Sequence, residues 1–552
     1  MDADFVISFT YAKEESRDTV FRQLVKRLSS VGLQIEARNG EEGSILVFVK
    51  CLEERLQLES YRERTQDWLQ GSRLAAPEVE TATSLHREPL TDAERLRLVH
   101  LILTAPTYDG GAGLTPGLNE WKLVKSIFPI HNTQFNKRWI FEWAKQWSVS
   151  DDQLTVIHNH FGSKTAYYFA FTQFYYKSLI FPTIAGASAY YLLPEFSPLY
   201  AVLLCGWTVQ FCQSWQRREK DLAVKWGVRG CGLRQRKRAA FKGDRQITNS
   251  MSGELSPYFP AWKRAIRQGL ALPFIFIAAI SLAAILSGIF ATEVFMGEVY
   301  NGPGKKYLLY LPTVLFTLLV PSFTAIYAAI AERLTLYENH EYESKHESSM
   351  IQKMFVLNFL ASYMALFLAA YVYIPFGHLL VPQIDVFALS SFGDKDAPPQ
   401  SFAINPNRLR NQLFYMTVTA QVINFGVETI LPYLQQKASS GSKQLKMRFR
   451  NSRGASEIFN DKDEASFLQR VRTEANMAEY DVQNDFREMV IQFGYSAMFS
   501  VVWPLTPLTA FVNNWIELRS DALKICIEMK RPIPIRTDSI GPWKEYVCLS
   551  FD

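Results

Sequence analysis

The sequence predicts an α-helical membrane protein that crosses the bilayer several times and begins with a mixed α+β domain. Residues 1–160 mix charged and apolar side chains, whereas the rest alternates long uncharged runs with densely charged segments. The run Met489–Ile516 has 28 residues without a charged side chain and is interrupted by Trp503-Pro504-Leu505-Thr506-Pro507. Because the run is long and carries helix breakers in the middle, it predicts a hairpin of two membrane helices.

The totals agree with this fold class. A chain of 552 residues is too long for one domain, and 48% hydrophobic with 14% aromatic residues is rich for a soluble protein. The six cysteines show no metal-binding spacing, so we expect free thiols. The chain starts with acidic Met1–Asp4 and no early apolar segment follows, so we expect no signal peptide and a cytosolic N-terminus. We find no nucleophile–base set and no nucleotide motif, and we expect neither an enzyme nor a nucleic-acid partner.

Residues 1–130 are predicted to form a cytosolic α+β domain, a ferredoxin-like plait. Phe5–Thr10 and Leu33–Ala37 alternate as strands do, and Arg17–Leu28 has helical periodicity. Asn39-Gly40 supplies a hairpin turn before a third strand, Ile45–Val49. Two further segments complete the domain: a helix at Leu52–Leu69 and an apolar run at Leu96–Leu103.

The membrane part is predicted to follow in two steps. Residues 131–164 interleave aromatic and charged residues, including Trp139, Trp143 and Trp147, which is typical of amphipathic helices at a membrane boundary. Residues 165–530 are predicted to hold about eight spans, two of them in the hairpin. The first six are Tyr167–Leu193, Phe196–Gln216, Gly269–Thr292, Tyr307–Ala331, Met354–Gly377 and Asn411–Gln436.

Loop charges predict the orientation in the membrane. Arg217–Arg245 holds eleven basic residues against three acids, and Lys437–Arg453 holds six basic residues and no acid. By contrast, Phe376–Asn407 has one Lys and three Asp. Because positive loops stay in the cytosol, the loops 217–262 and 437–484 are predicted to be cytosolic. The basic runs have two interpretations, topology alone or attraction to anionic lipid headgroups.

Four acidic residues flank the predicted hairpin. Asp485 and Glu488 are three residues apart, and Glu517 and Asp521 are four apart, so each pair shares a helix face, with Asn513 one turn earlier. Folding the hairpin brings both pairs to one depth, where they repel unless a cation lies between them. Oxygen ligands without Cys or His favour Ca²⁺. The alternative is that each acid is solvated or paired with a neighbouring base: Arg487, Arg519 or Lys524.

Polar residues of the predicted sixth span fall on two faces of the helix. One narrow wedge holds Thr417, Gln421, Asn424 and Glu428, and roughly the opposite side holds Gln412, Tyr415 and Thr419. Since Glu428 sits toward the cytosolic end, we expect it to join the four acids in one intramembrane pocket with Asn424. Five carboxylates nearly balance two Ca²⁺ ions.

The same span is predicted to contain a hinge. Gly426 lowers helix stability, and Pro432 cannot donate to the carbonyl of Glu428, so the helix is expected to bend beside the proposed ligands. A cation held between this span and the hairpin would bias the hinge toward one position.

Three motifs in this order resemble the calcium site of the anoctamin family: Asn424-Phe-Gly-Val-Glu428, Asp485-Phe-Arg-Glu488, and Asn513-Asn-Trp-Ile-Glu517-Leu-Arg-Ser-Asp521. The likeness extends from the plait to the end of the chain and looks closest to fungal members that scramble phospholipids. It implies a butterfly-shaped homodimer with two Ca²⁺ per subunit and a membrane-facing groove formed by the third to seventh spans. The implied ligands are Asn424, Glu428, Asp485, Glu488, Glu517 and Asp521, with Asn513 as a further candidate. Because the family has ten spans, residues 531–552 are expected to lead toward two last spans that this chain lacks.

Under this resemblance a polar groove is predicted beside the sixth span. Its predicted residues are Gln412, Tyr415 and Thr419 on the sixth span, Thr313, Thr317 and Ser322 on the fourth, and Glu293, Glu298, Arg408 and Arg410 at the outer mouth. A lipid headgroup can follow such a furrow while its tails stay in the bilayer. The alternative for each hydroxyl is a hydrogen bond to its own helix backbone.

The resemblance implies a Ca²⁺-activated phospholipid scramblase with accompanying non-selective ion conduction. The alternative is a Ca²⁺-gated anion channel without lipid transport, and a third interpretation is a membrane-contact tether. The expected partners are phospholipids, the membrane and a second copy of the chain. The expected location is the plasma membrane or the endoplasmic reticulum.

Overall fold

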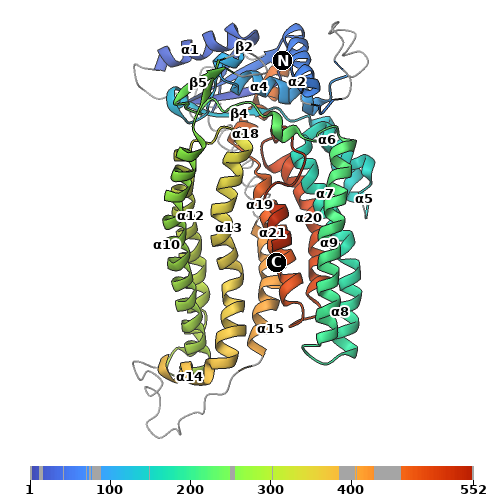
Figure 1. The fold of residues 1–552 in the computed structure, drawn as a ribbon, viewed down its shortest axis with the longest axis vertical. Helices are drawn as coiled ribbons and strands as arrows, with labels where there is room; N and C mark the ends of the chain where they lie inside the picture. The colour runs from blue at the N-terminus through green and yellow to red at the C-terminus, as the bar shows by residue number, and fades with distance from the viewer. Residues whose placement is uncertain are drawn as a thin grey trace.

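The structure is a computed structural model in which an α+β domain caps one end of a bundle of long helices (Figure 1). It describes residues 3–10, 17–41, 43–69, 71–73, 76, 89–147, 149–248, 255–300, 302–384, 405, 407–427 and 462–549. The α10, α12 and α13 helices stand on one side of the bundle and α7, α8 and α9 on the other, with α19 and α20 between them. The predicted fold class is confirmed.

The N-terminal domain is a four-stranded antiparallel sheet with the strand order β2–β3–β1–β4. This order, with helices after the first and third strands, is that of a ferredoxin-like plait. The strands are β1 (Phe5–Thr10), β2 (Leu33–Asn39), β3 (Ser44–Cys51) and β4 (Val124–Pro129). The helices are α1 (Arg17–Ser30), α2 (Glu53–Leu69) and α4 (Asp92–Thr104). The strand β4 was not predicted, because this short segment shows little alternation.

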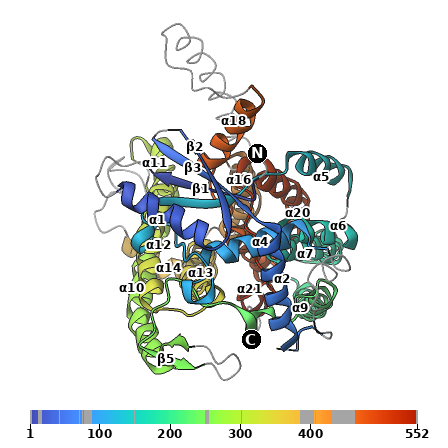
Figure 2. The same cartoon turned by 90° about the horizontal axis from the view of Figure 1, so that it is seen from above.

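Both faces of the sheet are covered, since successive side chains of a strand point to opposite faces. Ile7 and Phe9 face the domain's own helices and pack in one core with residues of α1, α2 and α4. Val6 faces the other way and packs against Leu468 and Val471 of α18 (Lys462–Asn476), which lies beside the strands in Figure 2. A late segment of the chain therefore completes the fold of the first domain.

Among the described residues, three helical stretches are long and apolar enough to cross a membrane: Ala261–Glu298, Lys305–Tyr337 and Glu343–Leu380. They coincide with the third, fourth and fifth predicted spans. Their parts are α10 (Ala261–Val294), η4 (Phe295–Val299), α11 (Lys305–Leu308), α12 (Leu311–Tyr337), α13 (Glu343–Leu368), η5 (Ala369–Tyr373) and α14 (Ile374–Ile384). The α10 helix packs against both α12 and α13.

The other bundle helices stand where the remaining spans were predicted. They are α7 (Ser163–Ser178), α8 (Ile180–Leu192) and α9 (Pro198–Lys225); α15 (Asn407–Phe414), η7 (Tyr415–Thr419) and α16 (Ala420–Phe425); and α19 (Val482–Gly494), η9 (Tyr495–Phe499), α20 (Thr506–Leu523) and η10 (Lys524–Glu528). The segments η4, η5, η7, η9 and η10 are π-helical turns. Smaller elements are η1 (Thr107–Asp109), η2 (Asn119–Trp121), η3 (Cys231–Arg234), β5 (Arg245–Thr248), β6 (Leu255–Tyr258) and α21 (Trp543–Leu549).

Two helices before the bundle occupy the segment 131–164, where an interfacial pair was predicted. In α5 (Thr133–Lys145), Trp139 and Trp143 are buried and pack against Phe169 of α7, and the Trp143 indole donates to the carbonyl of Leu518 at 2.8 Å. The second helix, α6 (Asp151–Phe161), also packs on α7. Trp139 and Trp143 therefore lie inside the protein, because one face of α5 is covered by other helices, and the location of this segment at a membrane boundary stays a prediction. Trp147 is 74% exposed.

Candidate functional site

The hairpin predicted at Met489–Ile516 is present. The first helix runs through α19 and η9 to Phe499, and α20 begins at Thr506, so the break falls at the predicted prolines. Pro507 stands in the first turn of α20, where a missing backbone N–H leaves no intrahelical bond unmade. Because the two helices of the hairpin are antiparallel, the end of α19 that carries Asp485 and the end of α20 that carries Asp521 lie at one level.

Two buried carboxylates meet at this level. Asp485 and Asp521 are each 3% exposed. The Lys524 ammonium donates to Asp485 Oδ1 at 2.8 Å, and the Tyr480 hydroxyl donates to Asp485 Oδ2 at 2.6 Å. The Tyr168 hydroxyl, from α7, donates to Asp521 Oδ2. Buried charge is costly unless it is paired and hydrogen-bonded, and these contacts meet that requirement for Asp485.

The other predicted acids lie around this pair. Asp485 and Glu517 are close enough to repel the Asp521 carboxylate. The Asn513 amide donates to Glu517 Oε1 at 3.4 Å, and Glu488 is partly exposed near Arg487 at 3.9 Å. The structure thus places Asp485 and Glu517 near Asp521, with Lys524 supplying a positive charge, whereas Glu488 contacts Arg487.

The donor set suits a hard divalent cation, since it consists of carboxylate and amide oxygens. Within the described ranges, however, no three Asp, Glu, His or Cys side chains stand in a position to hold one metal ion. One reason is that the Lys524 ammonium and the hydroxyls of Tyr480 and Tyr168 already donate to oxygens of these carboxylates. The fold therefore presents a buried acidic cluster in which Lys524 supplies the positive charge.

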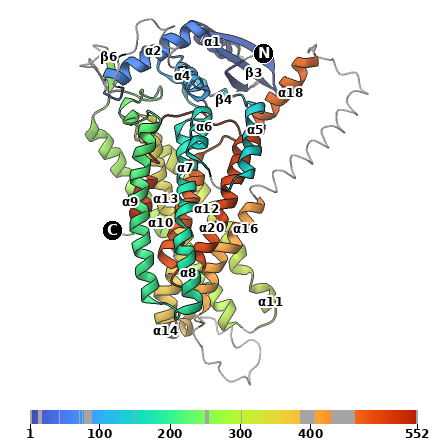
Figure 3. The same ribbon diagram turned by 90° about the vertical axis from the view of Figure 1, so that its right-hand side faces the viewer.

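The sixth helix is not gathered into this cluster. Asn424 is exposed at the end of α16, and Gly426 follows with open space where a side chain would project. The helix is also interrupted by the π-helical turn η7, a feature that often marks a functional site. Figure 3 shows α16 at the edge of the bundle. Two predicted residues, Glu428 and Pro432, lie outside the described residues.

The predicted outer mouth is assembled. Arg408 is 9% exposed and contacts Glu293 at 2.7 Å and Glu298 at 2.9 Å. Its guanidinium lies over the rings of Phe290 and Tyr373, each 5.2 Å from the ring centre. The Tyr373 hydroxyl donates to Glu298 at 2.7 Å. One buried cation thus joins two acids from the end of the third span, whereas Arg410 contacts Glu195 at 3.7 Å.

The predicted groove hydroxyls are less organised. Thr313 and Thr317 are exposed on α12, and the Thr317 hydroxyl donates to the Thr313 carbonyl at 2.8 Å, as the alternative interpretation expects. Ser322 bonds its own helix in the same way, through the carbonyl of Leu318. On the sixth helix, Tyr415 is exposed, and Gln412 and Thr419 are partly buried.

Two contacts to the cluster were missed from the sequence. Tyr168 lies more than 350 residues from Asp521, and nothing in the aromatic run of α7 marks it. Tyr480 precedes Asp485 by five residues, and a polar ring so near an acidic motif is a signal that could have been used. Lys524 had been considered as a partner for the acids, and it contacts Asp485.

Taken together, the fold and the cluster define a multi-span helical membrane protein with a plait domain and a buried acidic site between helices. A family model described as anoctamin, calcium-activated chloride channel, matches residues 157–549. A second, described as the alpha-beta plait domain in TMEM16 lipid scramblase, matches residues 2–124. The chain belongs to the anoctamin family.

Known relatives agree with this assignment. An uncharacterized protein of Schizosaccharomyces pombe is 31% identical over 99% of this chain and 81% of its own length. Human anoctamin-10 is 28% identical over 76% of this chain and 59% of its own length. Increased sodium tolerance protein 2 of Saccharomyces cerevisiae is 27% identical over 77% of this chain. The match spans 46% of that yeast protein, about half its length.

Proposed function

We propose that this protein is a Ca²⁺-activated phospholipid scramblase with accompanying non-selective ion conduction. The observation that carries the proposal is the convergence of Asp485 and Asp521, two buried carboxylates, with Lys524 as a displaceable positive charge. A fold that served only to span the membrane has no need of this costly arrangement.

The residues that would hold Ca²⁺ come from both sides of the site. The proposed ligands are Asn424, Glu428, Asp485, Glu488, Glu517 and Asp521, with Asn513 in support, for two ions per subunit of a homodimer. The ion would supply positive charge between the hairpin and the sixth helix, and differential affinity for two positions of that helix would provide the switch. The Tyr168 and Tyr480 hydroxyls already bond Asp521 and Asp485 and hold their carboxylates in place.

The lipid path is proposed to begin at the outer mouth. Arg408, Glu293 and Glu298 offer both signs of charge there, as a zwitterionic headgroup requires. From the mouth the path would pass Gln412, Tyr415 and Thr419 on one side and Thr313 and Thr317 on the other. Because the headgroup stays with these polar groups and the tails stay in lipid, the cost of burying the headgroup in hydrocarbon is avoided.

A Ca²⁺-gated anion channel is the second candidate, since the matching family model carries that description. The charges at the predicted outer mouth argue against an anion channel. Arg408 is paired with two carboxylates at once, so the entrance is not net positive and does not concentrate anions.

The test uses purified full-length chain in vesicles with a labelled lipid in both leaflets and a quencher added outside. We expect Ca²⁺ to accelerate loss of the inner-leaflet label and the Asp485→Ala/Glu488→Ala variant to remove that acceleration. Glu479→Gln is the matched control, because Glu479 is a nearby acid whose side chain is 69% exposed. Ca²⁺-dependent ion flux without lipid movement would replace the proposal by the channel.

A further inference from the structure

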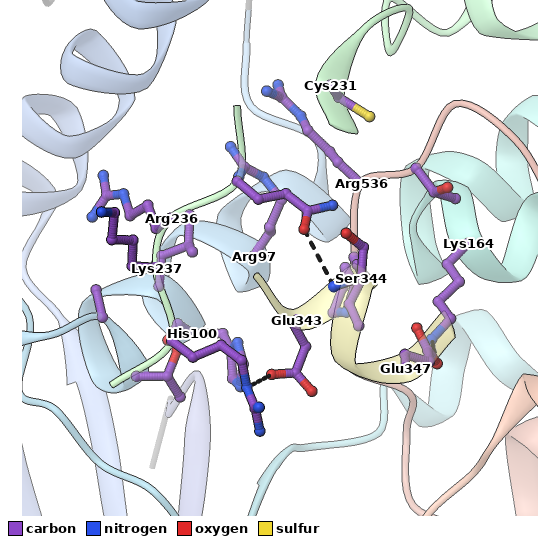
Figure 4. Close-up of a pocket in the computed structure, with 18 of the residues that line it drawn as sticks. Arg97, His100, Lys164, Cys231, Arg236, Lys237, Glu343, Ser344, Glu347 and Arg536 are labelled. Atoms are coloured by element: carbon purple, nitrogen blue, oxygen red, sulfur yellow. Dashed lines mark hydrogen bonds and ion pairs between the residues drawn. The ribbon is translucent and has the colours of Figure 1, made fainter. Parts of the chain in front are cut away.

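A cavity of about 430 Å³ lies outside the acidic cluster, between the plait, the segment after η3, the start of α13 and the chain after α20 (Figure 4). Small-molecule sites have volumes of about 300–1,000 Å³. Six basic and four acidic side chains line it. The basic ones are Arg97, Lys164, Arg236, Lys237, Arg238 and Arg536.

Three of these cations are fixed by partly buried acids. Arg97 contacts Glu63 at 3.1 Å and Glu94 at 2.8 Å, Arg536 contacts Glu94 at 3.0 Å, and Arg236 contacts Glu63 at 2.8 Å. Burial favours the neutral form of Glu94, but Arg536 and Arg97 outweigh burial and lower its pKa to about 2. Since removing one partner of a buried pair is strongly destabilising, this wall is a fixed part of the fold.

One cation at the rim has a partner that a ligand can replace. Arg238 Nε contacts Glu343 at 2.7 Å, and the Glu343 side chain is 65% exposed, so this ion pair is weak. Lys237 is held more firmly, because it contacts Glu341 at 2.8 Å and donates to the Pro257 carbonyl at 2.6 Å. A phosphate accepts short charge-assisted bonds from several donors at once, so a dianion can displace Glu343 toward solvent and lie beside Lys237.

The first turn of α13 adds a third favourable element to the rim. Its Ser344 backbone N–H donates to the Gln235 side-chain carbonyl at 3.3 Å, so a neutral amide caps the start of this 26-residue helix. Figure 4 shows Ser344 on the cavity wall with Lys237 and Arg236 opposite. Helix N-termini favour anions because their N–H groups and dipole point at the ligand.

Part of the remaining wall is apolar, among polar residues such as Thr104 and Gln483. Its apolar residues come from four parts of the chain: Leu101, Leu114, Ile351, Phe486 and Ile540. A bare inorganic anion makes no use of this surface. The cavity thus pairs a cationic rim with room for an apolar or aromatic body.

We propose that this cavity binds a phosphate monoester that carries an apolar or aromatic body. The phosphate would lie against Lys237, Arg238 and the first turn of α13, and the body would lie against Leu101 and Ile351. A soluble nucleotide and a lipid phosphate share this chemistry.

The cavity also touches the helix that carries Asp485. Glu347 lines it and accepts from Lys164 and, at 2.9 Å, from Gln483, which stands two residues before Asp485. A bound phosphate attracts Lys164 and adds negative charge near α19, so the cation site becomes more favourable. This regulatory step rests on the proposed function, and the ligand is expected to lower the Ca²⁺ concentration needed for half-maximal scrambling.

Binding is measured first, without Ca²⁺, as the shift in thermal unfolding of the full chain with AMP, dioctanoyl phosphatidic acid or inorganic phosphate. We expect a saturable shift with one of the two esters and at least about tenfold weaker binding to Arg238→Gln and to Lys237→Gln/Arg238→Gln, because charge-assisted bonds are lost. Arg245→Gln is the control, since Arg245 is an exposed basic residue outside the cavity.

Comparing these ligands distinguishes a soluble source of the phosphate from a lipid source. A shift with AMP identifies a soluble ester, and a shift with phosphatidic acid alone identifies a lipid. The proposal is overturned if neither ester binds, if inorganic phosphate binds equally well, or if Arg238→Gln binds like the wild type. These outcomes are independent of scrambling, so failure of the transport assay and failure of the cavity proposal are distinguishable.

Discussion

The α19–α20 hairpin and the sixth helix are held very differently by the fold. In α19, Asp485 is buried, as are Phe486, Met489 and Val490, and aromatic residues of α7 pack in the same core as this helix. In α16, by contrast, no residue is buried. In the proposed site the hairpin is therefore the packed half, whereas the α16 end of the sixth helix is the half that packing leaves exposed.

This difference suits a switch. A two-state element needs one part that keeps its geometry and another whose position changes at small cost. Lys524 keeps the hairpin half stable by pairing with Asp485. In the proposal, Ca²⁺ takes the place of the Lys524 ammonium beside Asp485 and also binds the sixth helix.

The largest effect is expected from Asp521→Asn, which breaks the packed half. Removing a buried charged oxygen from a hard-cation site is expected to raise the Ca²⁺ concentration for half-maximal scrambling by at least about 100-fold. Vesicle scrambling across a Ca²⁺ titration measures this. An unchanged titration would show that the hairpin does not sense the ion.

The next effect, of opposite sign, is expected from Lys524→Gln. Without the competing ammonium, the Ca²⁺ requirement is expected to fall about tenfold, since a hydrogen bond to a charged group contributes about 1.5–3 kcal/mol. Thermal unfolding without Ca²⁺ should show a less stable protein, because Asp485 loses its positive partner. Lys524→Arg, which keeps the charge, is the control, and a raised Ca²⁺ requirement in Lys524→Gln would contradict the exchange.

Two glycines sharpen the comparison between the halves. A Cβ at Gly426 meets nothing within 4 Å, so Gly426→Ala stiffens the helix without a clash. The stiffening, about 1 kcal/mol, is expected to raise the Ca²⁺ requirement about fivefold without loss of stability. A Cβ at Gly494 falls 2.1 Å from the Tyr363 hydroxyl, so Gly494→Ala is expected to cost about 1–3 kcal/mol of stability. Equal behaviour of the two variants in unfolding and scrambling assays would remove the distinction.

The smallest effect is expected at the outer mouth. Arg408→Gln leaves Glu293 and Glu298 without their shared cation, so the accompanying ion flux should become about twofold more cation-selective. Reversal potentials under a salt gradient measure this change. A loss of anion flux alone, with lipid movement unaffected, would separate the ion path from the lipid path.

The sequence predicted what local chemistry determines. Prolines located the hairpin, charge located its acidic ends, and periodicity gave most of the plait. Contacts between distant segments escaped it: Tyr168 with Asp521, and Trp143 with Leu518, each join residues more than 350 positions apart. The cavity depends on such contacts too, since Lys164 reaches Glu347 only in the folded chain. The role of Glu428 stays a prediction.

The most direct measurement is the distance between spin labels on the two halves, with the native cysteines replaced. One label is placed at Val427 on the sixth helix and one at Ile527 after α20, both exposed positions. A second pair within the hairpin, Leu508 and Ile527, serves as the rigid control. We expect Ca²⁺ to shorten the first distance in the wild type and not in Asp521→Asn, while the control distance stays constant. An unchanged first distance in protein that still responds to Ca²⁺ would contradict a sixth helix that closes on a packed hairpin.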